Sequence, residues 1–382
     1  MGPALKILQI SSAQSLGGGE RHLVDLVEGL VERGHQVDLA LRPNSPLIDE
    51  LRSSGKKGLA KVKVTTLPLR NSLDAFSARA LAKLVRQNQI QIVHAHMARD
   101  YPLAAYAVRG NKGARLIVTR HVLFPLSRLH RVTLAKAARI IAVSKAVATQ
   151  VRADAVAAPE RISVILNGID ASKFENASVR FHRERFLASW GLPENSLLIG
   201  TVGELTALKG HEEFLRAAAE VRKQFPRSHF VIAGTDSSRE NKNRAFLEKL
   251  IKELELTDHV RLVGWVEDLP QLYCALDVFV SASHTESFGL AITEAMASGT
   301  AVVATETEGA REIIQPGETG LLVPVGDVAA LATATTGLLE DESQRGRLGT
   351  AAQQAVAAQF SVERMVEETE EIYRAEIKSH LA

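Results

Sequence analysis

Short apolar blocks alternate with longer amphipathic stretches along the whole chain. Each block is three to six residues long and apolar at most successive positions, which is typical of strands covered on both faces. These blocks predict strands at residues 7–10, 37–41, 62–67, 90–94, 116–119, 140–144 and 162–166, and then at 197–202, 230–233, 260–263, 278–281, 301–304 and 321–323.

The intervening stretches have the spacing of helices. The clearest are predicted at 20–33, from 211 to 221, from Ser287 or Phe288 to 299, and at 361–378. Strands that alternate with such helices indicate βαβ units and parallel sheets. Two series of strands fit two doubly wound α/β domains, at residues 1–175 and 176–360, followed by a C-terminal helix at 361–382. The break is expected within the polar residues 167–195.

Composition excludes several classes of protein. With 46% hydrophobic and 24% charged residues, the 382-residue chain is not disordered. It lacks an apolar run of about 20 residues, so we do not expect a membrane span. Residues 1–20 lack the apolar block of a secretory signal. The single cysteine, Cys274, excludes an internal disulfide framework and a cysteine-based zinc cluster, which favours a cytosolic location.

The net charge of +2 hides an asymmetry between the two halves. Residues 1–175 hold 26 Lys and Arg against 13 Asp and Glu, a net charge of +13. The remainder, with 20 basic and 31 acidic residues, carries −11. We expect the basic half to face an anionic partner, although two domains that simply attract one another would show the same asymmetry.

Two glycine-containing loops resemble phosphate sites. Residues 15–20 (SLGGGE) follow the first strand and precede a helix. Glycines let the backbone approach a ligand, and a helix N-terminus offers free N–H groups to an anion. Residues 203–210 (GELTALKG) occupy the same position in the second half, where Lys209 could meet a diphosphate. Neither loop has the GxGxxG spacing of a dinucleotide site, and a tight turn without a ligand is the alternative.

A third segment, residues 284–299 (HTESFGLAITEAMASG), carries two carboxylates. Glu286 is predicted in the loop before the helix, and Glu294 about two turns inside the helix on its apolar side. A carboxylate on a buried face needs a partner. Two vicinal hydroxyls, as on a ribose, would satisfy Glu294, and a salt bridge to a neighbouring Arg or Lys is the alternative.

These segments resemble the retaining GT-B glycosyltransferases of family four. The most specific match is the glutamate pair of ESFGLAITEAMASG, and the motifs GGGE, NGID, KG, GWVEDLPQLYCALDVFVSAS, EGAREII and GETGLLVPVGD follow in the family's order. The resemblance covers nearly the whole chain. It implies two Rossmann-like domains that face a cleft, a C-terminal helix that crosses back to the first domain, and a nucleotide-diphosphate sugar as donor.

By position, the resemblance implies roles for single residues. Glu294 accepts the ribose hydroxyls, and Glu286 lies near the donor sugar. Lys209 binds the diphosphate and stabilises the departing nucleotide. His121, in the segment VTRHV, lies near the reacting sugar. Further donor or phosphate contacts are expected from Gly18, Gly19, Gly203, Phe288, Gly289, Leu290 and Arg120.

One position departs from the family pattern. The family usually has Gly-Arg-Leu where this chain has Gly203-Glu204-Leu205, and that arginine shares the diphosphate with the lysine. A carboxylate there repels a diphosphate unless it points away or pairs with a cation such as Lys209. Either Arg120, Arg239 or Arg311 supplies the missing charge, or donor binding is weakened.

The resemblance further implies front-face transfer with retention, no metal and no cofactor besides the nucleotide sugar. The acceptor is expected on the basic first domain. Residues 121–139, with Arg128 and Arg131 among interleaved apolar side chains, form a candidate surface for a lipid-linked glycan or an anionic membrane. An ordinary solvated helix is the alternative, and low aromatic content disfavours nucleic acid.

The expected function is therefore assembly of a surface glycan such as lipopolysaccharide on the cytosolic face of a membrane. Three alternatives remain. A nucleotide-sugar epimerase would turn over without an acceptor, and a nucleotide-sugar-binding protein would lack transfer. A dehydrogenase is disfavoured because no strand is followed by GxGxxG.

Overall fold

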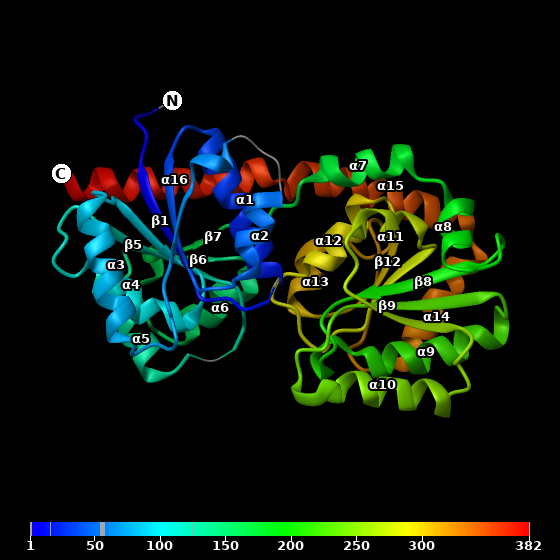
Figure 1. Ribbon diagram of the computed structural model, residues 1–382. Coiled ribbons are helices and arrows are strands. Elements are labelled where there is room, and N and C mark those ends of the chain that lie inside the picture. The colour runs from blue at the N-terminus through cyan, green and yellow to red at the C-terminus, as the bar shows by residue number, and fades with distance from the viewer. Residues whose placement is uncertain (1, 16, 54–57, 125, 382) are drawn as a thin grey trace. The chain divides into compact units, whose positions relative to one another are not determined.

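A computed structural model describes residues 2–15, 17–53, 58–124 and 126–381, with the side chains of Ser53, Ala60, Arg128, Leu129 and Leu381 outside that description. The chain forms two compact units, residues 1–168 with 362–382, and residues 169–361. The sequence placed the divisions at 175/176 and 360/361. The predicted pair of parallel α/β domains is confirmed (Figure 1).

The first unit contains a seven-stranded parallel sheet in the order β3-β2-β1-β4-β5-β6-β7. Its strands are β1 (Lys6–Ser11), β2 (Gln36–Leu41), β3 (Lys63–Thr66), β4 (Ile92–Ala95), β5 (Arg115–Arg120), β6 (Arg139–Ala142) and β7 (Ile162–Val164). Its helices are α1 (Gly18–Glu32), α2 (Pro46–Ser53), α3 (Ala75–Gln87), α4 (Tyr101–Val108), α5 (Arg128–Leu134), α6 (Lys145–Ala153) and α16 (Val362–Leu381), with short 3₁₀ turns η1 (Leu59–Lys61), η2 (Ala98–Asp100) and η3 (Pro159–Arg161).

The second unit contains a six-stranded parallel sheet in the order β10-β9-β8-β11-β12-β13. Its strands are β8 (Leu197–Val202), β9 (Ser228–Ala233), β10 (Val260–Gly264), β11 (Val278–Ser281), β12 (Ala301–Thr305) and β13 (Leu321–Val323). Its helices are α7 (Ala171–Arg180), α8 (Arg183–Ser189), α9 (His211–Gln224), α10 (Lys242–Glu253), α11 (Leu269–Ala275), α12 (Leu290–Ala297), α13 (Glu308–Ile313), α14 (Val328–Glu340) and α15 (Glu342–Gln359), with 3₁₀ turns η4 (Ala207–Lys209) and η5 (Arg239–Asn241).

Apolar strands form the centre of each unit, as the sequence predicts. In the first unit, β1 is buried along its last five residues, and the apolar side of α1 packs on it together with α16. The C-terminal helix therefore belongs to the first unit. Its Tyr373 is completely buried, and its Glu376 pairs with Arg139 at 2.8 Å. These contacts hold the last residues of the chain against the first sheet.

Three local expectations need correction. The strand predicted at 90–94 is β4 at Ile92–Ala95, two residues later at its start. The boundary between the units at 168/169 lies within the segment 167–195 where the break was expected, but the rest of that segment is not a polar linker: it holds α7 and α8, and Phe174 of α7 packs against Tyr273. Helix α12 begins at Leu290 rather than at Ser287 or Phe288, because Gly289 has a φ of +113° that a right-handed helix does not allow. Glu294 therefore lies just over one turn inside.

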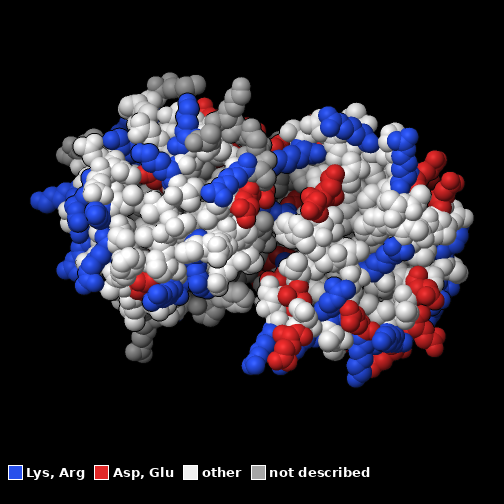
Figure 2. All heavy atoms as spheres, in the orientation of Figure 1, with Lys and Arg blue, Asp and Glu red and all other residues white. Residues whose placement is uncertain are grey.

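No helix among the described residues is both long and apolar enough to cross a bilayer. On the face shown in Figure 2, Lys and Arg predominate over the first unit, whereas basic and acidic side chains are mixed over the second. The charge asymmetry counted along the sequence is therefore visible at the surface.

Candidate functional site

Each of the two sheets has one point at which the order of its strands reverses. The strand order reverses between β1 and β4 in the first unit and between β8 and β11 in the second. Ligands of doubly wound sheets bind beside the carboxyl ends of the strands at such a point. The loops singled out in the sequence follow three of these strands: residues 15–20 follow β1, residues 203–210 follow β8, and Glu286 follows β11.

In the second unit, close packing against two glycines positions the loop that carries Lys209. The side chain of Lys209 lies against Gly203, where an added Cβ would be 3.3 Å from Lys209 Cδ. Gly210 has a φ of +64°, and a Cβ there would be only 1.9 Å from the carbonyl oxygen of Ala282. The absence of side chains at both glycines lets the Lys209 loop lie against the end of β11.

Lys209 and Glu286 meet at this edge of the sheet. The Lys209 ammonium lies 2.6 Å from Glu286 Oε1, and the Ser283 hydroxyl donates a hydrogen bond of 2.8 Å to the same oxygen. The backbone N–H of Gly309 donates to the carbonyl of Glu286 at 3.1 Å. A Cβ at Gly309 would be 2.4 Å from the carbonyl oxygen of Phe288. The loop is therefore held by a cation at its carboxylate and by α13 along its backbone.

The second carboxylate, Glu294, is 6% exposed. Its Oε2 accepts a hydrogen bond of 2.8 Å from the hydroxyl of Tyr273 on α11. A tyrosine hydroxyl is thus one partner of the carboxylate for which the sequence required a partner. Phe288 is buried against Phe360, and Leu290 is the first residue of α12, whose first-turn N–H groups have no helical acceptor.

Glu204 is exposed and makes no ion pair among the described residues, and Lys209 pairs with Glu286 instead. Of the three arginines considered as replacements, Arg239 pairs with Glu240 at 3.3 Å and Arg311 with Glu306 at 2.7 Å. Arg120 is in the other unit and is buried. Arg311 follows Gly309 on α13, so it is the candidate whose helix contacts the Glu286 loop.

In the first unit, helix α1 begins at Gly18, within the glycine segment 15–20, so that Gly18 and Gly19 belong to its first turn. The carboxylate of Glu20 accepts a hydrogen bond of 3.0 Å from the N–H of Gly17, and burial raises the pKa of Glu20. A Cβ at Gly19 would be 3.5 Å from the ring of His121. The glycine loop and His121 are therefore neighbours.

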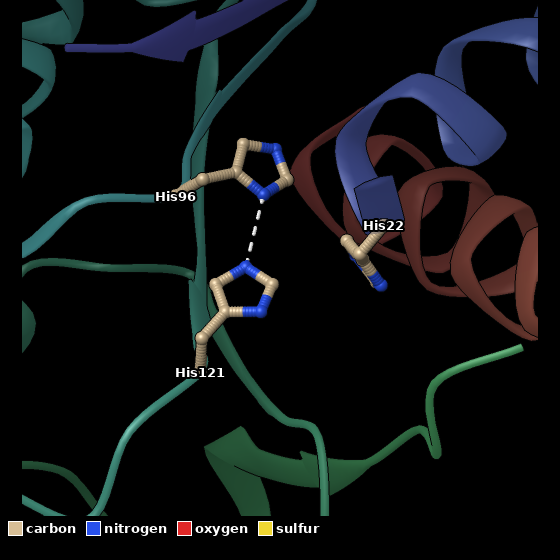
Figure 3. A group of neighbouring side chains, drawn as sticks. All are labelled: His22, His96 and His121. Carbon is tan, nitrogen blue, oxygen red and sulfur yellow. Dashed lines mark hydrogen bonds between the residues drawn. The ribbon is translucent and has the colours of Figure 1, made fainter. Parts of the chain in front are cut away.

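His121 belongs to a cluster of three imidazoles that the sequence did not predict (Figure 3). His22 comes from α1, His96 follows β4, and His121 follows β5. Nδ1 of His96 lies 3.4 Å from Nε2 of His121, and the ring of His22 is edge-on to that of His121. Burial lowers the pKa of His22 to about 4 and holds those of His96 and His121 well below the usual value, so all three rings are neutral at pH 7.

Buried hydrogen bonds connect this cluster to α16. Gln9 accepts from Nε2 of His96 at 2.8 Å and donates to the hydroxyl of Tyr373 at 3.2 Å. The same hydroxyl forms a hydrogen bond of 2.5 Å with Nδ1 of His94. The C-terminal helix thus helps to orient the histidines at the end of β4.

A buried carboxyl lies behind the glycine loop. Asp100 accepts a hydrogen bond of 2.9 Å from the N–H of Ser12. Its other oxygen, Oδ1, has no hydrogen-bond partner among the described residues. Burial raises the pKa of Asp100 to about 7.

The arginines proposed for phosphate or acceptor have varied surroundings. Arg120 is buried and donates to the carbonyl of Phe124, so it fixes its own loop. Arg131 is half exposed and pairs with Asp154 at 2.9 Å. The side chain of Arg128 lies outside the described part of the structure.

Sequence reasoning missed several of these residues for different reasons. Tyr273 and Ser283 lie within the motif GWVEDLPQLYCALDVFVSAS, but nothing in that motif marks them as partners of the glutamates, and only the fold brings them together. The segment His94-Ala95-His96 at a strand end was a usable signal, as was His22 just after the glycine loop. Tyr373 was not predictable, because it is 364 residues from its partner Gln9.

Comparison with known proteins agrees with this geometry. Residues 16–173 match the family described as Glycosyltransferase Family 4, and residues 182–355 match Glycosyl transferases group 1. The chain belongs to these glycosyltransferases. The two matches together cover most of the chain, though not α16, and the family resemblance seen in the motifs is thereby confirmed.

Relatives of this glycosyltransferase differ in their named substrates. A D-inositol 3-phosphate glycosyltransferase of Corynebacterium urealyticum is 29% identical over 96% of this chain and 93% of its own length. A lipopolysaccharide core biosynthesis glycosyltransferase, LpsE of Rhizobium meliloti, is 32% identical over 45% of this chain and 48% of its own. The structure of Anabaena Alr3699/HepE with UDP and glucose superimposes with a TM-score of 0.84 at 24% identity, over 97% of this chain and all of that one, which shows the shared GT-B fold.

Proposed function

We propose that this glycosyltransferase moves a sugar from a nucleotide-diphosphate sugar to a glycan or lipid-linked acceptor, with retention of configuration and without a metal at the donor site. The observation that carries the proposal is the meeting of Lys209, Ser283 and Glu286 at the carboxyl edge of β8 and β11. Cation, hydroxyl and carboxylate converge there beside the N-terminus of α12.

The donor's parts fit groups on this edge. The Lys209 ammonium can exchange part of its contact with Glu286 for the diphosphate, and the first-turn N–H groups of α12 favour the same negative charge. Glu294, positioned by Tyr273, is proposed to accept the ribose hydroxyls. UDP is the first nucleotide to test, because the similarly folded HepE is described with UDP and glucose.

Transfer would proceed on one face of the sugar. The bond from the anomeric carbon to the leaving phosphate oxygen breaks as the acceptor oxygen bonds to that carbon on the same side. The departing phosphate takes the acceptor's proton, and Lys209 stabilises the charge that develops on the diphosphate. His121 is proposed to contact the reacting sugar.

The first unit is proposed to bind the acceptor, because it is basic and carries exposed apolar side chains near α5. Phe124 and Val132 are more than half exposed, and so are Leu73 and Phe76. A hydrogen bond between Ser72 and His130 connects the segment before α3 to α5. Basic and apolar side chains together suit an anionic, lipid-linked acceptor at the cytosolic surface of a membrane. The name of LpsE supports lipopolysaccharide assembly as the process.

The test is transfer from UDP-, GDP- and ADP-sugars to lipid-linked acceptors with a chelator present. We expect one nucleotide to support transfer and the product to keep the donor's anomeric configuration in its NMR spectrum. An inverted product would contradict retention. Nucleotide binding without transfer to any acceptor would favour the binding-protein alternative, and altered sugar without an acceptor would favour an epimerase.

A further inference from the structure

We propose that His22, His96 and His121 form a binding site for a divalent ion of the zinc class in the first unit. All three residues belong to the first unit, whereas Lys209, Glu286 and Glu294 belong to the second. One ligand nitrogen from each ring lies within 4.8 Å of the others. Neutral imidazole nitrogens bind Zn²⁺ and related transition-metal ions such as Cu²⁺ and Ni²⁺, whereas Mg²⁺ and Ca²⁺ prefer oxygen.

The distance between two of the rings already suits a shared ion. Two nitrogens bound to one tetrahedral zinc at about 2.0–2.1 Å are about 3.4 Å apart. Nδ1 of His96 and Nε2 of His121 are 3.4 Å apart and face one another (Figure 3). Because Nε2 of His96 donates to Gln9, the proton between these two nitrogens is carried by Nε2 of His121. When zinc binds, it would take the place of this proton, which would move to Nδ1 of His121.

The surroundings of His96 match those of a metal ligand. A ligating histidine commonly donates its other ring N–H to an oxygen, which fixes its tautomer. Nε2 of His96 lies 2.8 Å from the amide oxygen of Gln9. The Gln9 amide is itself oriented by Tyr373. This arrangement leaves Nδ1 of His96 with a lone pair that is directed at His121.

His22 supplies the third ligand and is otherwise unexplained. It is 3% exposed, and neither ring nitrogen has a hydrogen-bond partner among the described residues. The side chain of Asn167 lies close enough to oppose the fall in its pKa, but burial dominates. A buried, unsatisfied imidazole is costly, and coordination would satisfy it. Three protein ligands leave a fourth position for water, which half-buried His121 makes reachable from solvent.

Calorimetric titration of the whole chain with Zn²⁺ tests the site. We expect about one ion bound per chain, no binding of Mg²⁺, and affinity at least tenfold weaker in His22→Phe, which keeps a ring of similar size. The matched control is His259→Phe, which alters a stacked pair with His229 in the second unit. Loss of binding in His259→Phe but not in His22→Phe would show an adventitious surface ion and overturn the proposal.

Cobalt provides a readout that does not depend on any variant folding. Bound Co²⁺ in a tetrahedral site absorbs visible light strongly, so we expect an intense spectrum with the unmodified protein that Zn²⁺ abolishes. A weak octahedral spectrum would contradict the three-histidine site. Because His121 is shared, zinc should also inhibit sugar transfer reversibly; only that consequence rests on the proposed function, whereas binding is measured without substrates.

Discussion

At the scale of single residues, each carboxylate of the candidate donor site is held by a different partner. Glu286 shares one oxygen between an ammonium and a hydroxyl, whereas Glu294 receives a tyrosine hydroxyl in the interior. Glu286 is therefore tied to a group proposed to bind phosphate, whereas Glu294 is anchored by Tyr273 on α11. The two carboxylates can be tested separately.

Glu294→Gln should lower the affinity for a nucleoside diphosphate about 10- to 100-fold, because a charge-assisted hydrogen bond contributes roughly 1.5–3 kcal/mol. The amide oxygen can still accept from Tyr273, so the fold should persist. Calorimetry with UDP and with inorganic diphosphate makes the comparison. Weakened binding of UDP alone supports a ribose contact, and unchanged UDP binding would exclude it.

Asp100 should make stability depend on pH. Burial raises its pKa from 3.8 to about 7, so the folded state retains a proton that the unfolded state has lost. The contribution of protonated Asp100 to the free energy of unfolding is fully present below about pH 4. It is lost as the pH rises from there through 7, by about 1.4 kcal/mol per pH unit. Asp100→Asn keeps an acceptor for Ser12. Urea unfolding at several pH values should therefore show that the free energy of unfolding of this variant falls less steeply with pH than that of the unmodified chain. Asp258→Asn, at an exposed position, is the control, and equal pH dependence in the two variants would refute the assignment.

At the scale of elements, the loops that carry Lys209 and Glu286 are positioned by close approach of their backbones. Gly210 and Gly309 each lie where a Cβ would meet a carbonyl oxygen of a neighbouring loop. These contacts join the loop after β8, the loop after β11 and the start of α13. The proposed site therefore depends on residues that have no side chain to offer a ligand.

Gly210→Ala should destabilise the second unit by roughly 1–3 kcal/mol and weaken nucleotide binding, because the new Cβ would push Ala282 away from the Lys209 loop. Gly317→Ala is the control, since Gly317 has a similar φ of +76° with no atom within 4 Å. Thermal unfolding and calorimetry measure both effects. Equal losses in the two variants would attribute the effect to backbone strain alone.

The sequence predicted the positions of strands more reliably than the contacts between side chains. Strands β8, β11 and β13 have the predicted bounds, because each begins with at least three consecutive apolar residues, the pattern typical of parallel strands. The start of α12 was misplaced, since the left-handed Gly289 is visible only in the backbone. The motifs named Lys209 and Glu286 separately, whereas their 2.6 Å contact depends on strand order. The histidine cluster depends on three separate segments in the same way.

At the scale of the whole molecule, the chain returns to its first unit at the end. Residues 362–382 belong with residues 1–168. Within α16, Tyr373 accepts a hydrogen bond from Gln9 of β1, and Glu376 pairs with Arg139 at the start of β6. The second unit, residues 169–361, is thus an insertion between two parts of the first. The two units should respond differently to loss of the C-terminus.

Truncation after Ser361 should destabilise the first unit by at least roughly 5 kcal/mol, because it removes buried Met365, Val366 and Tyr373 together. The second unit should remain folded. Hydrogen exchange should show loss of protection in β1 and α1 but not in β8 and β11. A control truncation after Lys378 should change little, and loss of protection in both units would contradict this division of the chain.

The central claim is that the second unit binds a nucleotide-diphosphate sugar through Lys209. Calorimetric titration of UDP, GDP and ADP in the presence of a chelator tests it most directly, using the unmodified chain, Lys209→Ala and the exposed control Lys223→Ala. We predict that one nucleotide binds, that Lys209→Ala weakens binding at least tenfold, and that Lys223→Ala does not. Absence of binding to all three nucleotides, or equal binding by Lys209→Ala, would contradict the account.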